Sequence, residues 1–171
     1  TLFRSKNLMK KWTKKESNGG GREWVYYKEK PRIIIEKYIK ADDLIDYKFF
    51  CFGGKAYYLY IINGRRLGGK ANFGIFDIDY NFLPYFRVGE NKMKHIPLKP
   101  KNFDNMIKIA EILSADFPHV RVDLYNVQEK IIFGELTFFA GSGYQIFEPD
   151  EFDFILGEHF RLPKEKMELN Q

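Results

Sequence analysis

Short runs of aromatic and β-branched residues, separated by glycine or proline, dominate the middle of this chain. Residues 57–62 read Tyr-Tyr-Leu-Tyr-Ile-Ile, and aromatic residues make up 18% of the sequence. Such residues are enriched in strands, and turn residues between short runs are typical of antiparallel pairing. The sequence therefore predicts strands at residues 33–35, 47–52, 55–62, 73–80, 120–125 and 131–138.

Two segments show helical spacing instead. Residues 2–12 place apolar side chains among basic ones and predict a short amphipathic helix. In residues 102–115, Phe103, Met106 and Ala110 recur on one helix face, with Asn102 as a candidate N-cap. Because 44% of the 171 residues are hydrophobic, the chain can bury a core, and a mixed α+β domain is expected.

The charge distribution and the cysteine content bear on the binding partners and the cellular compartment of the protein. The net charge is +5, and residues 1–32 hold ten Lys or Arg against three Glu, so the basicity is local. Such a segment could attract phosphates, nucleic acid or anionic lipid, or be a solvated arm.

The single cysteine, Cys51, cannot form an internal disulfide. With no apolar stretch long enough to cross a membrane, we expect a soluble cytoplasmic protein, and peripheral attachment to the inner face of the bacterial membrane stays open.

Residues 120–138 carry the most informative pattern. Strand alternation places Arg121 and Asp123 on one face, and Glu135 with Thr137 on one face of the following strand, together with Ile131 and Phe133. A three-residue loop at 127–129 would set Arg121 opposite Glu135, with Asp123 diagonal to it. Carboxylates at this spacing can share Mg²⁺ with substrate phosphates. An ion cluster on a solvated sheet face is the alternative.

A glycine-flanked turn follows directly, at Gly141-Ser142-Gly143, where backbone amides could approach an anionic ligand. This order of Asp strand, Glu strand and glycine turn resembles the C-terminal hairpin of ATP-grasp enzymes such as D-alanine:D-alanine ligase. The resemblance implies that Asp123 and Glu135 are Mg²⁺ ligands, that Thr137 stands where the family usually has Asn, and that Arg121 steadies the transferred phosphate.

Upstream, Glu36-Lys37-Tyr38-Ile39 resembles the ATP-grasp hinge that recognises adenine. About ten residues on, Asp46 stands where the family has an acid that binds ribose, and Lys48 could face phosphate or substrate. Four segments resemble the TupA-like branch, which is associated with teichuronopeptide and other surface polysaccharides: Arg22-Glu23-Trp24, Pro31-Arg32-Ile33-Ile34, residues 46–55 and Phe133-Gly134-Glu135-Leu136-Thr137-Phe138.

The resemblance implies the C-terminal half of an ATP-grasp fold, an antiparallel sheet with helices packed on one side. Residues 1–30 would be the basic tail of an incomplete N-terminal subdomain, residues 31–160 the nucleotide and metal domain, and residues 161–171 a C-terminal tail. The same resemblance implies ATP and Mg²⁺ as cofactors, and a carboxylate substrate with a nucleophilic acceptor as partners. Two alternatives stay open: a glycosyltransferase or other polysaccharide-assembly enzyme that uses a nucleotide sugar, and, less favoured, a non-catalytic module that binds a nucleotide or single-stranded nucleic acid.

Overall fold

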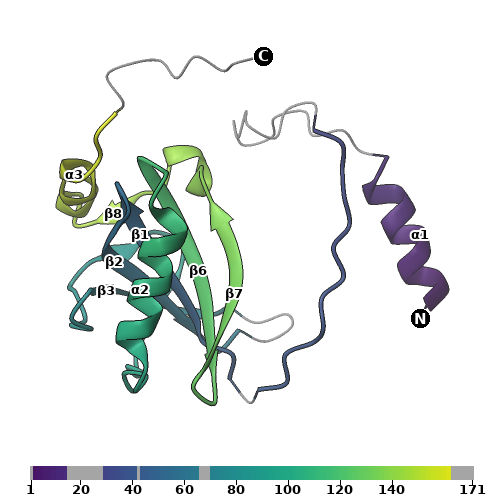
Figure 1. Cartoon of the computed structure of the whole chain (residues 1–171), viewed down its shortest axis with the longest axis horizontal. Helices are drawn as coiled ribbons and strands as arrows, with labels where there is room; N and C mark the ends of the chain where they lie inside the picture. Colours follow the sequence, from purple (N-terminus) through teal and green to yellow (C-terminus); the bar gives the residue numbers. More distant parts are fainter. Residues whose placement is uncertain (1, 15–28, 42, 66–69, 163–171) are drawn as a thin grey trace. The chain divides into compact units, whose positions relative to one another are not determined.

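A computed structural model describes residues 2–14, 29–41, 43–65 and 70–162 (Figure 1). The chain divides into two compact units. Residues 1–40 with 141–144 form the first, and residues 41–140 with 145–171 form the second. Each unit is described by itself.

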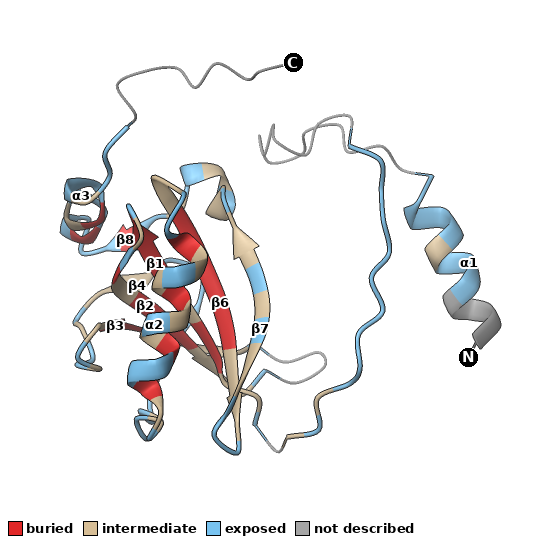
Figure 2. Ribbon diagram, viewed as in Figure 1, coloured by how far each residue is buried: buried red, intermediate tan, exposed pale blue. Residues whose placement is uncertain are grey.

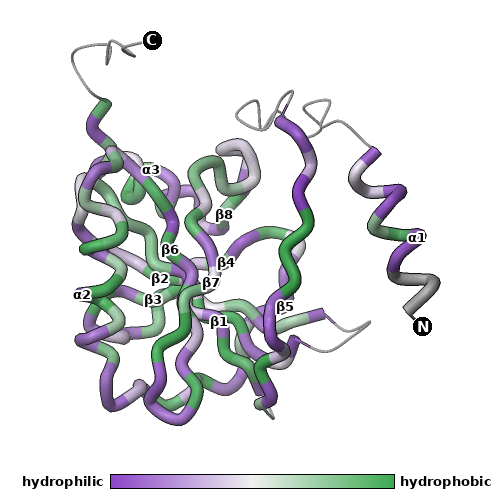
Figure 3. Tube along the Cα trace, turned by 45° about the vertical axis from the view of Figure 1, so that its right-hand side comes forward, coloured by the Kyte–Doolittle hydropathy of each residue, from purple (hydrophilic) through white to green (hydrophobic). Residues whose placement is uncertain are grey.

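The first unit begins with helix α1, Leu2–Trp12, which confirms the helix expected there. Hydrophilic and hydrophobic residues are interspersed along it, as Figure 3 shows. Residues 29–41 contain no helix or strand, and Ile34 and Ile35 are 83% and 79% exposed. The prediction of a buried strand at residues 33–35 is therefore wrong: the segment forms no strand in the described part of the chain, and Figure 2 colours most of residues 29–41 as exposed.

The second unit is built on a six-stranded sheet in the order β5-β3-β2-β1-β6-β7. All neighbouring strands are antiparallel except β3 and β5. A tight turn at Gly53 and Gly54, both with left-handed backbone (φ 55° and 79°), joins β1 to β2. The strands are β1 (Asp46–Phe52), β2 (Lys55–Asn63), β3 (Asn72–Asp77), β5 (Asn91–Lys92), β6 (His119–Val127) and β7 (Lys130–Thr137).

Helix α2, Phe103–Ser114, covers one face of this sheet and confirms the helix predicted at residues 102–115. Its buried side chains Phe103, Met106 and Ala110 pack against strand residues such as Phe49 and Val122, all at most 1% exposed. Figure 2 shows the inner side of α2 and the central strands as the buried part of this unit. Asn102 lies at the N-cap position, but its side chain makes no capping bond and contacts the carbonyl of Glu129 instead.

The opposite sheet face carries a second apolar cluster, which includes Phe50, Tyr60 and Phe73. Helix α3, Glu151–Glu158, contributes Phe152 and Leu156 to it. A two-stranded sheet of β4, Phe86–Arg87, and β8, Phe147–Glu148, borders this face. The α+β class and the mainly antiparallel sheet are confirmed, with α2 and α3 on different faces of the sheet.

Candidate functional site

Six of the predicted site residues lie together on three neighbouring strands of the second unit. Strand alternation and register place them on the face that α2 does not cover, beside Phe50 and Tyr60. Lys48 is paired with Asp123 across β1 and β6, Asp123 with Glu135 across β6 and β7, and Arg121 with Thr137. We call this set the ionic cluster: Asp46, Lys48, Arg121, Asp123, Glu135 and Thr137.

The register of β6 and β7 differs from the one expected. Asp123, and not Arg121, lies opposite Glu135, because Gly134 forms a β-bulge without a partner and the loop holds two residues, Gln128 and Glu129, both with positive φ. The bulge also reverses the faces along β7, so that Ile131 packs into the core under α2 and does not share a face with Glu135. A Cβ added to Gly134 would lie 3.0 Å from the Asp123 carbonyl oxygen, which explains glycine at this position.

Arg121 is the centre of the ionic cluster. Its Nε and Nη2 donate to Oδ1 and Oδ2 of Asp123 at 2.7 and 2.9 Å, and Nη2 also donates to Glu135 Oε1 at 3.1 Å and Thr137 Oγ1 at 2.9 Å. Both Arg121 and Asp123 are buried. Burial disfavours the guanidinium charge, yet the hydrogen bonds and the charge of Asp123 outweigh it, so the pKa of Arg121 is raised.

Lys48 joins the other side of the cluster. Its Nζ contacts Asp46 Oδ2 at 3.0 Å and also Oδ2 of Asp123. Within the described residues, Asp46 Oδ1 is buried and has no hydrogen-bond partner. Burial raises the pKa of Asp46, and the charge of Lys48 opposes that effect. A buried oxygen without a partner is costly unless water or a ligand supplies one, so this edge of the cluster is a candidate binding position.

The donor chemistry of the ionic cluster fits a hard divalent cation. Asp123 and Glu135 offer carboxylate oxygens and Thr137 a hydroxyl, and oxygen ligands are the ones that Mg²⁺ prefers. In the described parts of the chain, no group of three or more His, Cys, Asp or Glu side chains is arranged to hold a metal ion. A metal held here would need further ligands from water or phosphate, as is common for Mg²⁺.

The remaining predicted residues lie in the first unit. Glu36, Lys37 and Tyr38 are exposed, Tyr38 to 84%, and Ile39 is half-buried. Gly141, Ser142 and Gly143 form a turn in which all three have left-handed φ, at 57°, 57° and 75°, and the Tyr144 amide donates to the Gly141 carbonyl at 3.0 Å. Ser142 adopts this conformation without being glycine, so the turn is a strained one.

Two residues near the ionic cluster were not singled out from the sequence. Arg65 lies 3.7 Å from Asp46 Oδ2, in a segment after β2 that carries no motif. Tyr60 is paired with Lys48 across β1 and β2, and its hydroxyl donates to Gln145 Oε1 at 3.4 Å. The turn at residues 53–54 alone would pair Lys48 with Leu59. Tyr57 is left unpaired as a β-bulge and shifts the register by one residue, so hairpin register could not have identified Tyr60.

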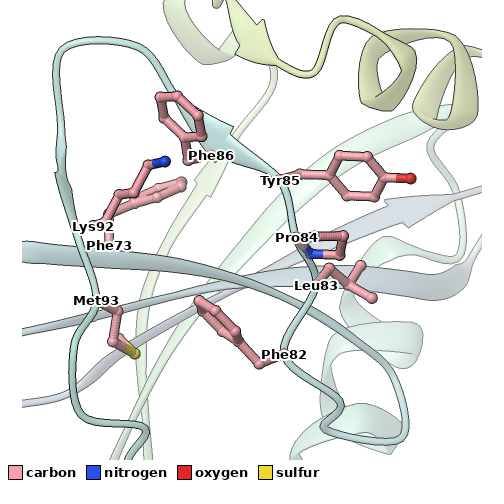
Figure 4. A pocket seen from close by; sticks show the side chains of 8 residues that line it. All are labelled: Phe73, Phe82, Leu83, Pro84, Tyr85, Phe86, Lys92 and Met93. Carbon is pink, nitrogen blue, oxygen red and sulfur yellow. The ribbon is translucent and has the colours of Figure 1, made fainter.

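A separate pocket of about 170 Å³ lies at the end of the sheet formed by β3 and β5 (Figure 4). Its lining is mostly apolar, and the Nζ of its one lysine lies 3.6 Å from the centre of a phenylalanine ring. None of the predicted site residues lines it. The lining residues are Phe73, Phe82, Leu83, Pro84, Tyr85, Phe86, Lys92 and Met93.

Comparison with known proteins identifies the family. No curated protein and no solved structure matches the chain. The profile of one family, described as TupA-like ATPgrasp, matches residues 2–161, which is nearly the whole chain and includes every residue of the ionic cluster. The expected resemblance is thereby confirmed, and the chain belongs to the TupA-like ATP-grasp family.

Proposed function

We propose that this protein is an ATP-dependent carboxylate ligase that works through an acyl phosphate. Membership of an ATP-grasp family supports ATP binding and a ligase-type role in general. The observation that carries the finer proposal is the buried Arg121–Asp123 pair facing Glu135, on the sheet face that α2 leaves open. This arrangement combines a fixed cation with carboxylate oxygens, the groups that phosphoryl transfer needs.

The proposed reaction has two steps. A carboxylate oxygen of the substrate attacks the γ-phosphorus of ATP and ADP leaves, which yields an acyl phosphate. A nucleophilic acceptor, such as an amine, then attacks the carbonyl carbon, loses a proton and releases phosphate. In the first step the Arg121 guanidinium would neutralise charge on the transferred phosphoryl group, and its bonds to Asp123 hold it in place beforehand.

Other residues would bind the reactants. Asp123, Glu135 and Thr137 would hold Mg²⁺, which when bound supplies positive charge to the phosphates. Asp46, with its unpartnered Oδ1, would accept a ribose hydroxyl, and Lys48 would meet phosphate. In the proposed assignment, Glu36-Lys37-Tyr38-Ile39 receive adenine, and the amides of Gly141-Ser142-Gly143 face the anionic substrate.

The proposal also covers the polymer that the reaction helps to assemble and the cellular location of the enzyme. From the resemblance to the TupA-like branch we place the reaction in the assembly of a bacterial cell-surface polysaccharide or peptide polymer, with a small or polymeric carboxylate as one substrate, on the cytoplasmic side. None of the helices in the described residues combines the length and apolarity needed to cross a bilayer.

The test compares the thermal stability of the chain with MgATP, with a magnesium nucleotide sugar and with no ligand. A ligand at a hundredfold its Kd adds about 2.7 kcal/mol, which corresponds to a rise of roughly 5–10 °C in Tm for a chain of this size. We expect that rise with MgATP alone, and its loss in the double variant Asp123→Asn/Glu135→Gln.

The matched control is Glu151→Gln/Asp153→Asn, the same chemical change on the exposed surface of α3, which should keep the full shift. A shift with the nucleotide sugar and none with MgATP would replace the ligase by a glycosyltransferase. Release of ADP that depends on an added carboxylate, with hydroxylamine trapping the acyl phosphate as a hydroxamate, would then identify the donor.

A further inference from the structure

Both carboxylate oxygens of Asp123 are already occupied by cations. Arg121 donates to each of them, and Lys48 contacts Oδ2 from the neighbouring strand. The same lysine reaches Asp46 Oδ2 at 3.0 Å, so one ammonium group bridges two carboxylates that come from β1 and β6. Oδ2 of Asp123 thus already accepts from two cations, and a divalent ion that binds this oxygen must displace one of them.

The net charge of the ionic cluster also disfavours the binding of a free divalent ion. Asp46, Asp123 and Glu135 carry three formal negative charges, and Lys48 and Arg121 carry two positive ones. A single formal negative charge is left to attract a divalent ion, before the more distant Arg65 is counted. Like charges at contact distance repel strongly in a partly buried site, so both fixed cations oppose a free metal ion.

The two cations differ in mobility. Arg121 is held by four hydrogen bonds to three side chains, in a planar fork that does not turn easily. Lys48 has a flexible stem and a compact ammonium that rotates freely. Only Lys48 can leave Asp123 without dismantling the rest of the cluster, and a triphosphate offers it a stronger partner than a carboxylate.

We infer that Lys48 is a specificity-determining residue that keeps free divalent ions out of the site and yields Asp123 only to a metal that arrives with nucleotide phosphates. The inference rests on the proposed function for its nucleotide, but its first half concerns the free protein. It predicts that metal and nucleotide bind together, and that removing the lysine charge opens the site to metal alone.

The experiment is a titration of the full 171-residue chain with Mn²⁺, followed by electron paramagnetic resonance of the free ion, in the absence of nucleotide. The wild type should bind weakly at this site. Lys48→Met should bind at least about tenfold more tightly, because one unit charge at contact distance is removed. Lys48→Arg, which keeps the charge, should behave as the wild type, and Lys48→Met/Asp123→Asn should lose the gain.

Controls separate this effect from general changes in charge or folding. Lys108→Met, the same change on the exposed side of α2, should leave Mn²⁺ binding unchanged. Circular dichroism checks that each variant folds, and if Lys48→Met does not, Lys48→Gln removes the charge while keeping a hydrogen-bond donor. Wild-type protein that binds Mn²⁺ alone as tightly as the charge-free variant would overturn the inference.

A second arm adds a non-hydrolysable ATP analogue to the wild type. Joint binding of Mn²⁺ and analogue, each weak alone, supports both proposals. Gain of Mn²⁺ binding in Lys48→Met with no analogue binding in any variant would support the role of Lys48 and count against the proposed ATP site. The two proposals can therefore fail separately.

Discussion

Arg121 and Asp123, two residues apart on β6, point to the same side of the sheet and form a two-point ion pair with N to O distances of 2.7 and 2.9 Å. Both side chains are buried, so each is a close counter-charge to the other away from water. Removing one partner of such a pair leaves the buried charge of the other with less compensation.

We expect Arg121→Met to lower the free energy of unfolding by about 3–5 kcal/mol, measured by urea denaturation. The loss arises because Asp123 would keep only Lys48 as a cationic partner. Arg161→Met, the same change at an exposed position, is the control and should alter stability by at most about 0.5 kcal/mol. A cost for Arg121→Met as small as that of the control would show that the pair does not stabilise the fold.

A second prediction concerns the β-bulge at Gly134. Gly134→Ala would place a Cβ 3.0 Å from the Asp123 carbonyl oxygen and 3.3 Å from the Tyr125 ring, so the strands must shift. We expect a loss of about 1–3 kcal/mol in urea unfolding, together with weaker MgATP binding, since Glu135 follows directly. Gly157→Ala in α3, where an added Cβ would meet nothing within 4 Å apart from the adjoining backbone of its own helix, should instead be neutral or stabilise by up to about 1 kcal/mol. Equal effects of the two substitutions would contradict the close approach at the bulge.

Much of the second unit could be predicted from the sequence, because its elements carry strong local signals. Helix α2 and the strands of the β6–β7 hairpin follow from apolar spacing, and the β1–β2 hairpin also from its glycine turn. The gathering of Arg121, Asp123 and Glu135 on one face also follows from strand alternation. The register of β6 against β7 could not be predicted, because the unpaired Gly134 changes every pairing beyond it. A bulge of this kind leaves little trace in a hydrophobic pattern.

The strand predicted at residues 33–35 shows a second reason why the sequence alone did not predict the whole structure. Three consecutive isoleucines predict a buried strand from composition alone, but a strand becomes buried only when another strand or helix covers it. In the described structure this segment has no such partner, and Ile34 and Ile35 are exposed. Likewise, the contact of Lys48 with Asp123 depends on the pairing of β1 with β6, which are separated by more than 60 residues of sequence, whereas its contact with Asp46 lies within β1.

His119 gives a prediction about pH. It packs between aromatic rings, 4.4 Å from Phe52 and 6.1 Å from Phe50 between centroids, and its Nδ1 lies 2.9 Å from the Cys51 carbonyl. Burial lowers its pKa below the ordinary value of 6.5. The unfolded chain therefore binds the proton more readily, so the stability present above pH 6.5 is lost as the pH falls through the lowered pKa.

We expect the free energy of unfolding to fall between about pH 7.5 and pH 5, and His119→Gln to flatten part of that slope. Urea denaturation at intervals across this range measures it. His95→Gln, at an exposed position, should keep the wild-type slope. Identical slopes for wild type and His119→Gln would mean that the imidazole titrates alike in both states.

Cys51 is the single cysteine of the chain and lies buried under α2, so its thiol reports on opening of the core. Burial raises its pKa from 9.0 to about 11, which alone lowers the reactive thiolate fraction by about a hundredfold at neutral pH. We expect iodoacetamide at about pH 8 to alkylate the native protein at least about a hundredfold more slowly than the urea-unfolded chain. Lys108→Cys/Cys51→Ala carries its thiol on the exposed side of α2 and should react quickly in both states. Native Cys51 that reacts as quickly as this control would show that α2 leaves the sheet readily, and that the core does not hold the strands of the ionic cluster rigidly in place.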